Sequence, residues 1–323
     1  MLTEEITLII PHQAQANQID ALFKSMASWL MLPQEIIVVD SSPNALALNN
    51  DFLIFCQQRD IKLELIHEES IFPGHARNLG IQAANNDLLA FLDVHTTPNK
   101  AWLNDAYRQF VELKPLAIRG ITCYEASTAK EAIIIASTFG FKSLQTLPGS
   151  LIHKKVFLQC GLFIENVRAG EDGDWMHRAH LHHIPFIDST QHISYTGLSG
   201  ITYRKIVTKW YRNYKYTHHL PFFQKHKDIY FYASAILLII LARNWNWVTI
   251  YLTGGLLFIP NVTKISLTLV FVSYFLIRVI FLPVKKGAAK ILLNPLNLIS
   301  IMLLSMILDL VKIAAFVHTK IVK

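Results

Sequence analysis

The sequence predicts an α/β domain with a mostly parallel sheet and helices on both faces, followed by an all-α transmembrane region. Two observations carry this prediction. The first hundred residues alternate short apolar runs with amphipathic segments. The last 95 residues contain one of the 23 acidic residues, Asp309, and are dominated by Leu, Ile, Val, Phe and Ala. Because an acid in the bilayer centre costs about 2.5–3.5 kcal/mol, this composition indicates membrane-embedded helices.

The order of the predicted elements places two acids at one edge of a sheet. Strands are expected at 6–10, 35–40, 62–66, 88–93 and near 116–124, and helices at 17–30, 45–59, 75–85, 101–113, near 130–140 and after Gly170. Alternation of strands and helices implies a parallel sheet, and ligands bind beyond the carboxyl ends of such strands. Asp40 and Asp93 each end a strand, so we expect both to face one crevice.

Charge divides the chain into three predicted parts, 1–203, 204–228 and 229–323. The first carries 14 basic and 21 acidic side chains, whereas residues 204–227 carry seven basic and no acidic ones. A basic block with interleaved aromatic residues before an apolar region suits anionic headgroups and marks the cytoplasmic side, so 204–228 is expected to be interfacial. The acidic first part argues against nucleic acid as a partner.

The apolar tail is expected to cross the membrane several times. Its apolar segments cover 229–242, 247–260, 265–283 and 291–317. The first two would each span roughly 21 Å, short of the ~30 Å hydrocarbon core, so three and four spans both stay open. The N-terminus has no signal-peptide pattern, and the cysteines are odd in number, three in all. We therefore expect a cytoplasmic catalytic domain on a multi-pass protein of the cell (inner, cytoplasmic) membrane.

Three stretches carry the residue types that chemistry needs. In Asp93-Val94-His95, an oxygen and a nitrogen ligand beyond a strand could hold a divalent cation, and this pair suits Mn²⁺ better than Mg²⁺. The alternative is a strand-end acid that caps a turn beside a surface histidine. The acids of Gly170–Asp174 could bind a cation or supply a general base, or merely complement a helix dipole.

The third stretch is Gly74-His75-Ala76-Arg77-Asn78-Leu79-Gly80. Arg77 could pair with a phosphate or hold the acidic loop, and Asn78 could satisfy backbone groups. The alternative is an ordinary helix N-terminus after a turn that glycine permits.

Together these motifs resemble family 2 glycosyltransferases of the GT-A fold over about residues 5–200. The resemblance implies that Asp40 contacts the base or ribose of a nucleotide, with Pro11 and Ser42 beside it. It places Asp93 and His95 at the Asp-x-Asp position that holds the metal and the diphosphate. It makes Asp172 the base that activates the acceptor hydroxyl for inverting attack. Glu171 and Asp174 are expected to support that base, and Arg77, Asn78 and Arg178 complete the expected donor-binding set.

Two departures from the family pattern bear on these expectations. His95 replaces the second acid, which is similar to the Asp-x-His of polypeptide N-acetylgalactosaminyltransferases and of succinoglycan-type exopolysaccharide glycosyltransferases, and leaves Mn²⁺ or Mg²⁺ open. The family often has a histidine some twenty residues after the base, a register that falls on Tyr195. His192 is expected as a further metal or phosphate ligand, with a surface histidine as the alternative.

The expected function is transfer of one sugar per acceptor. The Gln-x-x-Arg-Trp motif of processive family members is absent from residues 208–214. The resemblance therefore implies a membrane-anchored inverting glycosyltransferase that uses a nucleotide-sugar donor and a lipid-linked or polysaccharide acceptor. A nucleotidyltransferase would need a glycine-rich basic loop after the first strand, and residues 12–16 offer none. A non-catalytic membrane scaffold on a degenerate transferase domain is the other alternative.

Overall fold

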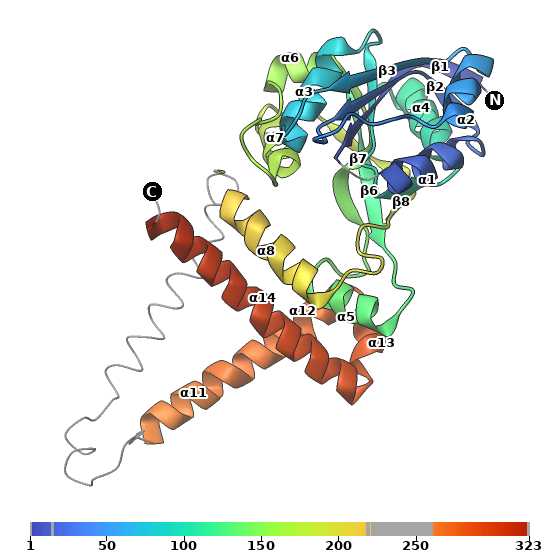
Figure 1. The fold of residues 1–323 in the computed structure, drawn as a ribbon. Helices are drawn as coiled ribbons and strands as arrows, with labels where there is room; N and C mark the ends of the chain where they lie inside the picture. The colour runs from blue at the N-terminus through green and yellow to red at the C-terminus, as the bar shows by residue number, and fades with distance from the viewer. Residues whose placement is uncertain (1, 14–15, 218–219, 221–260, 322–323) are drawn as a thin grey trace. The chain divides into compact units, whose positions relative to one another are not determined.

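The computed structural model describes residues 2–13, 16–217, 220 and 261–321. The chain divides into two compact units (Figure 1). The first comprises Met1–Ser127 and Lys142–Ile201, and the second comprises Thr128–Phe141 and Thr202–Lys323. Residues Thr128–Phe141 lie in sequence between the two segments of the first unit but belong to the second unit. No pattern in the sequence indicates this.

The first unit is built on one mixed sheet of eight strands in the order β3-β2-β1-β4-β7-β6-β8-β5. Strands β3, β2, β1 and β4 run parallel, β6 and β8 are also parallel, and the other three pairings are antiparallel. The strands are β1 (Leu2–His12), β2 (Met31–Asp40), β3 (Lys62–His67), β4 (Leu88–Phe91), β5 (Thr96–Pro98), β6 (Ala117–Tyr124), β7 (Leu144–His153) and β8 (Phe186–Tyr195). The predicted α/β architecture is confirmed.

Helices cover both faces of this sheet (Figure 1). One apolar core joins β1 to α1 (Ala16–Met26), α2 (Asn50–Gln58) and α4 (Trp102–Leu113). The other joins it to α3 (Pro73–Ala83), α6 (Lys155–Cys160) and α7 (Glu171–Leu181). Along β1, Ile6, Leu8 and Ile10 enter the first core and Ile9 enters the second, as the two-residue period of a strand requires. A strand buried on both faces explains its unbroken apolar run.

The structure corrects several predicted element boundaries. Strand β1 continues through Pro11 to His12, because the carbonyl groups of this strand still pair with β2 although proline has no N–H to donate. Strands β5, β7 and β8 were not predicted. Strand β7 contains Pro148 and Gly149, which are typical of turns, and the mixed sequence of β8 hides its alternation.

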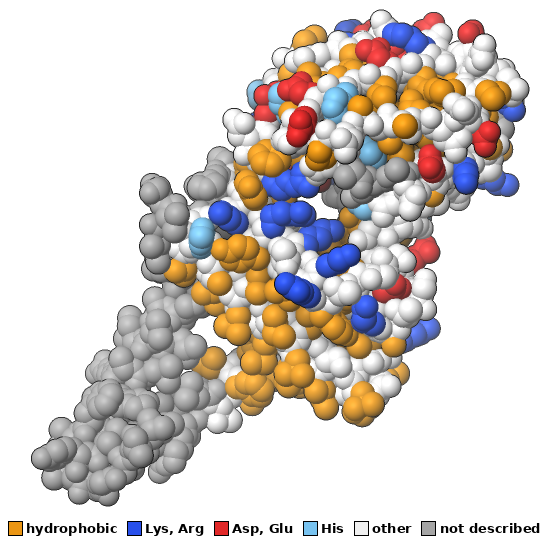
Figure 2. Space-filling model, in the orientation of Figure 1, with side chains coloured by type: hydrophobic (Ala, Val, Ile, Leu, Met, Phe, Trp, Pro, Cys, Tyr) orange, Lys and Arg blue, Asp and Glu red, His pale blue; other side chains and the backbone are white. Residues whose placement is uncertain are grey.

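The second unit is helical. It contains α5 (Ala129–Ser137), α8 (Tyr203–Thr217), α11 (Asn261–Tyr274), the π-helix η1 (Phe275–Phe281), α12 (Leu282–Lys285), α13 (Ala289–Leu292) and α14 (Pro295–Ile321). In the described part of the chain, Thr268–Lys285 and Pro295–Thr319 are long and apolar enough to cross a membrane. The expected segments at 229–242 and 247–260 lie outside the described residues. Many large apolar side chains of these helices are exposed, and Figure 2 shows them gathered on the surface of this unit.

Candidate active site

The carboxyl ends of β1, β2 and β3 bring His12, Asp40 and His67 into one register. The Asp40 carboxylate is fully buried and accepts hydrogen bonds from His12 Nδ1 at 2.8 Å and His67 Nδ1 at 3.2 Å. It also accepts from the backbone and hydroxyl of Ser42 and from Leu46 N at 2.7 Å. Burial alone would raise the pKa of Asp40, but the bonds from Ser42, His12 and Leu46 lower it to about 2. The acid is therefore ionised at neutral pH.

These contacts surround the acid that is expected to touch the base or ribose of a nucleotide. The two oxygens of Asp40 accept five hydrogen bonds, which is about as many as a carboxylate can accept. The carboxylate orients two imidazoles at the strand ends. A ring that donates through Nδ1 presents an accepting Nε2, so His67, about one-third exposed, is the better-placed side chain for a ligand N–H or O–H. Sequence reasoning missed both histidines because their register with Asp40 depends on strand order.

Arg77 on α3 joins the two acidic motifs. Its guanidinium donates from Nη1 to Glu171 Oε1 at 2.6 Å and from Nη2 to Asp93 Oδ1 at 2.9 Å. The Arg77 side chain is 5% exposed and lies over the ring of Phe163. Burial would lower the pKa of Arg77, but the negative charges of Asp93, Glu171 and Asp172 raise it above its usual value. Arg77 is therefore always charged. The motif after β4 and the first turn of α7 thus share one cation.

The rest of the Gly74–Gly80 motif fixes the loop that precedes α7. A Cβ atom on Gly74 would lie 2.1 Å from Ile164 O, so this close approach requires glycine. Asn78 donates to Phe163 O and accepts from Phe163 N, each at 2.9 Å. Asn78 also donates to Glu165 at 2.9 Å. Asn78 is expected among the donor-binding residues. In the structure its amide forms hydrogen bonds with the backbone of this loop, which is the role suggested for it from the motif alone.

The three acids at the start of α7 have different environments. Asp174 is 4% exposed and forms an ion pair with Arg178 Nε at 2.8 Å. Arg178 also donates to the carbonyl groups of Cys160 and Leu162, so it positions α7 rather than facing a donor. Glu171 is paired with Arg77, as above. Asp172 is half-buried, and its carboxylate accepts the N–H of Gly173 at 2.7 Å.

An aromatic cluster borders the same acids. The Tyr195 ring lies 5.1 Å from the Tyr124 ring and 5.9 Å from the His95 ring, at the ends of β8, β6 and the start of β5. Burial raises the pKa of Tyr124, and the neighbouring Tyr195, Asp172 and Asp93 raise it further. The tyrosines were not predicted, although the expected histidine register fell on Tyr195.

His192, which is expected as a further metal or phosphate ligand, lies beside Ser143 on β7's N-terminal side. Its Nδ1 is 3.1 Å from Ser143 Oγ, and it is three residues from Tyr195 on the same strand. Side chains an odd number of residues apart point to opposite faces of a strand, so His192 and Tyr195 face different sides. Within the described residues, no three His, Cys, Asp or Glu side chains gather closely enough to hold a metal unaided. Asp93 and His95 fit a Mn²⁺ or Mg²⁺ ion only if the substrate phosphates supply further ligands, as is common for such ions.

Arg168 is a further cation at this edge that sequence reasoning missed. Its Nη2 donates to Gln13 Oε1 at 2.5 Å, and its guanidinium lies 5.9 Å from the centre of the Phe72 ring. Gln13 directly follows β1, and Phe72 precedes α3. No spacing pattern marks Arg168, because it reaches this position from the irregular loop before α7.

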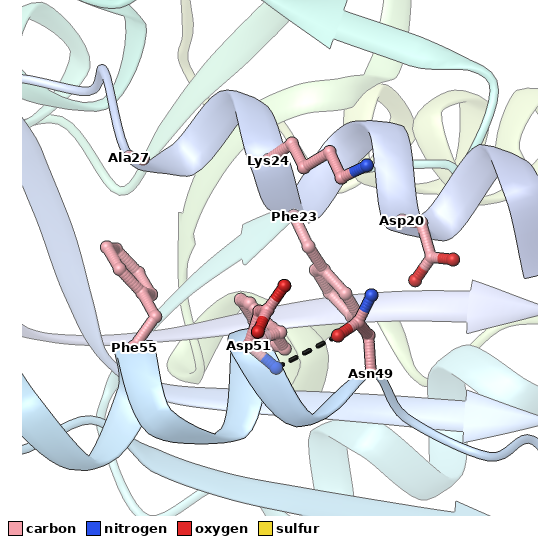
Figure 3. A pocket seen from close by; sticks show the side chains of 8 residues that line it. Asp20, Phe23, Lys24, Ala27, Asn49, Asp51 and Phe55 are labelled. Atoms are coloured by element: carbon pink, nitrogen blue, oxygen red, sulfur yellow. Dashed lines mark hydrogen bonds between the residues drawn. The ribbon is translucent and has the colours of Figure 1, made fainter.

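A pocket elsewhere in the first unit does not coincide with these residues. It lies between α1 and α2 (Figure 3). Its lining residues are Asp20, Phe23, Lys24, Ala27, Asn49, Asp51, Phe52 and Phe55. It contains none of the acids that end β2 and β4 or begin α7. The candidate active site is therefore the strand-end cluster around Arg77.

Comparison with known proteins indicates the family that the first unit resembles. Residues 7–154 match the model of the family described as Glycosyl transferase family 2. The match covers 148 of the 323 residues, and over this segment the chain is similar to glycosyltransferase family 2. The matched segment includes the strand ends, Arg77 and the Asp93–His95 pair, and the acids of α7 lie beyond it. The domain that contains this segment has a fold of the GT-A type.

Two curated relatives, both named pre-mycofactocin glycosyltransferase and from two strains of Mycobacterium tuberculosis, are 27% identical over 186 residues. The match covers 53% of this chain and 38% of each relative, so the chain spans well under half of their length. Their name supports family 2 without extending to the succinoglycan-type enzymes that the Asp-x-His pair suggested.

A solved structure with a TM-score above 0.5 supports the fold. A mannosyltransferase from Pyrobaculum calidifontis, in complex with GDP-Man and Mn²⁺, is 14% identical with a TM-score of 0.54. That match covers 98% of this chain and 86% of the other. S. aureus TarS 1-349 in complex with UDP-GlcNAc is 15% identical with a TM-score of 0.39 and covers 68% of each chain.

Proposed function

We propose that this protein is a membrane-anchored inverting glycosyltransferase that transfers one sugar from a nucleoside-diphosphate sugar to a lipid-linked or glycan acceptor. The observation that carries the proposal is the bridge from Arg77 to both Asp93 and Glu171. It joins the acid expected beside the donor diphosphate to the helix turn that bears the expected base. Two motifs almost eighty residues apart in sequence therefore serve one reaction centre.

Residues at the carboxyl ends of the strands are assigned to binding the nucleotide-sugar donor. His67, which contacts Asp40 and is about one-third exposed, is placed to meet a nucleotide beside Pro11 and Ser42. Asp93, with its side chain 29% exposed, and His95 are the residues that would hold a divalent cation. When bound, such a cation neutralises the diphosphate and makes it a better leaving group. In the mannosyltransferase complex from Pyrobaculum calidifontis, Mn²⁺ accompanies GDP-Man, which favours testing this ion first.

The acceptor side falls to Asp172. Among the three acids of the α7 turn, Glu171 and Asp174 each pair with an arginine at short distance. A base must be ionised and directed at the hydroxyl it deprotonates, and a carboxylate held by an arginine is a poor base. Asp172 remains as the acid that removes the acceptor proton, while Glu171 and Asp174 position the turn. This division of roles follows the expectation that Glu171 and Asp174 support the base.

Membrane anchoring rests on composition and exposure. Helix α8 buries Ile206 and Trp210, while Arg204, Lys205 and Arg212 are exposed. An amphipathic helix of this kind suits the headgroup layer of an anionic membrane. The two helices long enough to cross a bilayer follow in the same unit. We propose that the family 2 domain lies on the cytoplasmic side of the cell membrane.

The proposed donor class can be tested by a screen of nucleotide sugars for thermal stabilisation of the full chain in detergent, with and without Mn²⁺. A ligand present at about 100 times its dissociation constant stabilises the folded state by roughly 2.7 kcal/mol. We expect at least one nucleoside-diphosphate sugar to raise the melting temperature, and the rise to depend on Mn²⁺ or Mg²⁺. If no nucleotide sugar stabilises the protein with either ion, the non-catalytic scaffold becomes the better description.

A further inference from the structure

Two adjoining cavities lie at the amino ends of the strands of the first unit, away from the candidate active site. Their volumes are about 620 Å³ and about 510 Å³, within the range of small-molecule sites, and they share Gln34, Asn85 and Asn86. Gln34 and Asp40 are six residues apart on β2, so the shared wall lies roughly 20 Å along this strand from Asp40. We call the two cavities together the amide groove.

The buried carboxylate of Glu35, which is 1% exposed, fixes part of the lining of the amide groove. It accepts from Thr7 Oγ1 at 2.6 Å, from Lys62 Nζ at 2.8 Å, from Asn85 N at 2.9 Å and from the side-chain amide of Asn85. Asn86 Nδ2 in turn donates to Thr7 Oγ1 at 3.2 Å. Burial alone would raise the pKa of Glu35, but the hydrogen bonds from Lys62, Thr7 and Asn85 lower it. The acid is therefore ionised at neutral pH and holds these donors in place.

Four side-chain amides line the amide groove, those of Gln34, Gln57, Asn85 and Asn86. Asn85 and Asn86 each donate through Nδ2 to the network around Glu35, so each keeps its side-chain carbonyl oxygen for a further hydrogen bond. In the part of the chain that the structure describes, the side chains of Gln34 and Gln57 form no hydrogen bond with the protein. An amide group both donates and accepts, so this lining suits a ligand whose own groups do both.

The charged side chains of the amide groove narrow the class of ligand. Its described acids are Glu4, Glu5, Glu35, Asp60 and Asp87, and its described cation, Lys62, is paired with Glu35. An acidic lining of this kind repels phosphates and carboxylates. Glu5, Asp60 and Asp87 are exposed to water and need no cation to neutralise them. Among the described residues, no three His, Cys, Asp or Glu side chains are close enough to hold a metal ion. A neutral ligand with many hydroxyl groups therefore fits the amide groove best.

The lining of the amide groove is partly ordered before a ligand arrives. Each side chain that a ligand must immobilise weakens binding, and Asn85 and Asn86 are already held by Glu35 and Thr7. On the other side of the groove, the register of β1 with β2 shifts between Glu4 and Thr7. Such a shift breaks the regular alternation of side chains along a strand, here beside Glu4 and Glu5, which both line the groove.

We propose that the amide groove binds a neutral oligosaccharide and is a second glycan site, separate from the reaction centre. Each sugar hydroxyl donates one hydrogen bond and accepts others, which matches the amides and carboxylates of the groove. The choice of a glycan over other polyhydroxylated ligands rests on the proposed transferase function, because a glycan is one of its acceptor classes. Such a site holds a glycan acceptor close to the enzyme without taking part in the chemical step.

The test is a binding titration of the full chain, in a detergent without a sugar headgroup, with cellopentaose, maltopentaose, chitopentaose and spermidine. We expect at least one pentasaccharide to bind more tightly than its monosaccharide and than spermidine. Gln34→Ala combined with Gln57→Ala should weaken this binding about tenfold, since each hydrogen bond between neutral groups changes affinity by roughly two- to tenfold. Gln82→Ala is the matched control, because Gln82 is an exposed glutamine on α3 outside the groove, and it should leave binding unchanged.

Several results would overturn the inference. If no pentasaccharide binds, or if the double variant binds it as tightly as the wild type, the amide groove is not a glycan site. Tighter binding of spermidine would make it a site for cations. Nucleotide-sugar binding, measured on the same samples, separates the two proposals. If the donor binds but no pentasaccharide does, only this inference fails, and if a pentasaccharide binds but no donor does, the proposed function fails. An unchanged melting temperature shows that the double variant is folded.

Discussion

Replacement of Asp172 by Asn should lower the turnover number by about 10²–10⁴-fold while the affinity for the nucleotide-sugar donor changes little. An amide cannot accept the acceptor proton, and loss of a general base typically has this effect. The substitution preserves size, and the Gly173 N–H that Asp172 accepts can still donate to the amide oxygen. Steady-state turnover with saturating acceptor, together with donor titration, measures both quantities.

Asp51→Asn is the matched control for that experiment. Asp51 also lies in the first turn of a helix, α2, and is exposed, so its removal changes the helix-dipole interaction without touching the proposed site. Its turnover should stay near that of the wild type. Turnover of Asp172→Asn within tenfold of wild type would transfer the base to another group or support the scaffold alternative.

Replacement of Arg77 by Met should destabilise the first unit by about 3–5 kcal/mol. The substitution leaves the Glu171 carboxylate, 7% exposed, without its cation, and an unpaired buried charge is the main cost of breaking such a pair. A change of this size lowers the melting temperature by roughly 6–20 °C for a domain of this length. Thermal unfolding of the full chain in detergent measures the shift.

Two further variants test whether the burial of the Arg77–Glu171 ion pair causes the loss of stability in Arg77→Met. Arg108→Met removes an exposed i,i+4 pair with Glu112 at 3.6 Å, which should change stability by less than about 0.5 kcal/mol. Arg77→Met combined with Glu171→Leu should be more stable than Arg77→Met alone, since no charge is then left unpaired there. Equal melting temperatures for Arg77→Met and the wild type would mean that Arg77 does not join the two motifs.

Sequence patterns name candidate residues where these follow the ends of buried strands, but not where tertiary packing brings residues together. Asp93 and the acids of α7 are candidates because a strand or a helix start precedes each of them. The fully enclosed state of Asp40 could not be foreseen, because His12, Asp40 and His67 meet only through the register of three strands. The same limit applies to Arg178, whose charge fits a ligand or a structural ion pair equally well from sequence.

The second unit shows a different limit. The pattern of residues 130–140 predicts a helix, and α5 has a capping box between Thr128 and Glu131. Nothing local distinguishes this helix from one that packs on the sheet, yet its end is bound by Arg278 and Lys286, about 140 residues later. Helix existence follows from local sequence, whereas the partner of a helix is a tertiary property.

The central claim is that Asp93 binds the donor diphosphate through a divalent cation. The most direct measurement is a calorimetric titration of the full chain with the nucleoside diphosphate of the stabilising donor, with and without Mn²⁺, for the wild type, Asp93→Asn and Asp87→Asn. Asp87 is an exposed acid just before the opposite end of β4, so it serves as the matched control. We expect Mn²⁺ to strengthen binding to the wild type and to Asp87→Asn but not to Asp93→Asn. An equal Mn²⁺ effect in Asp93→Asn would contradict the account.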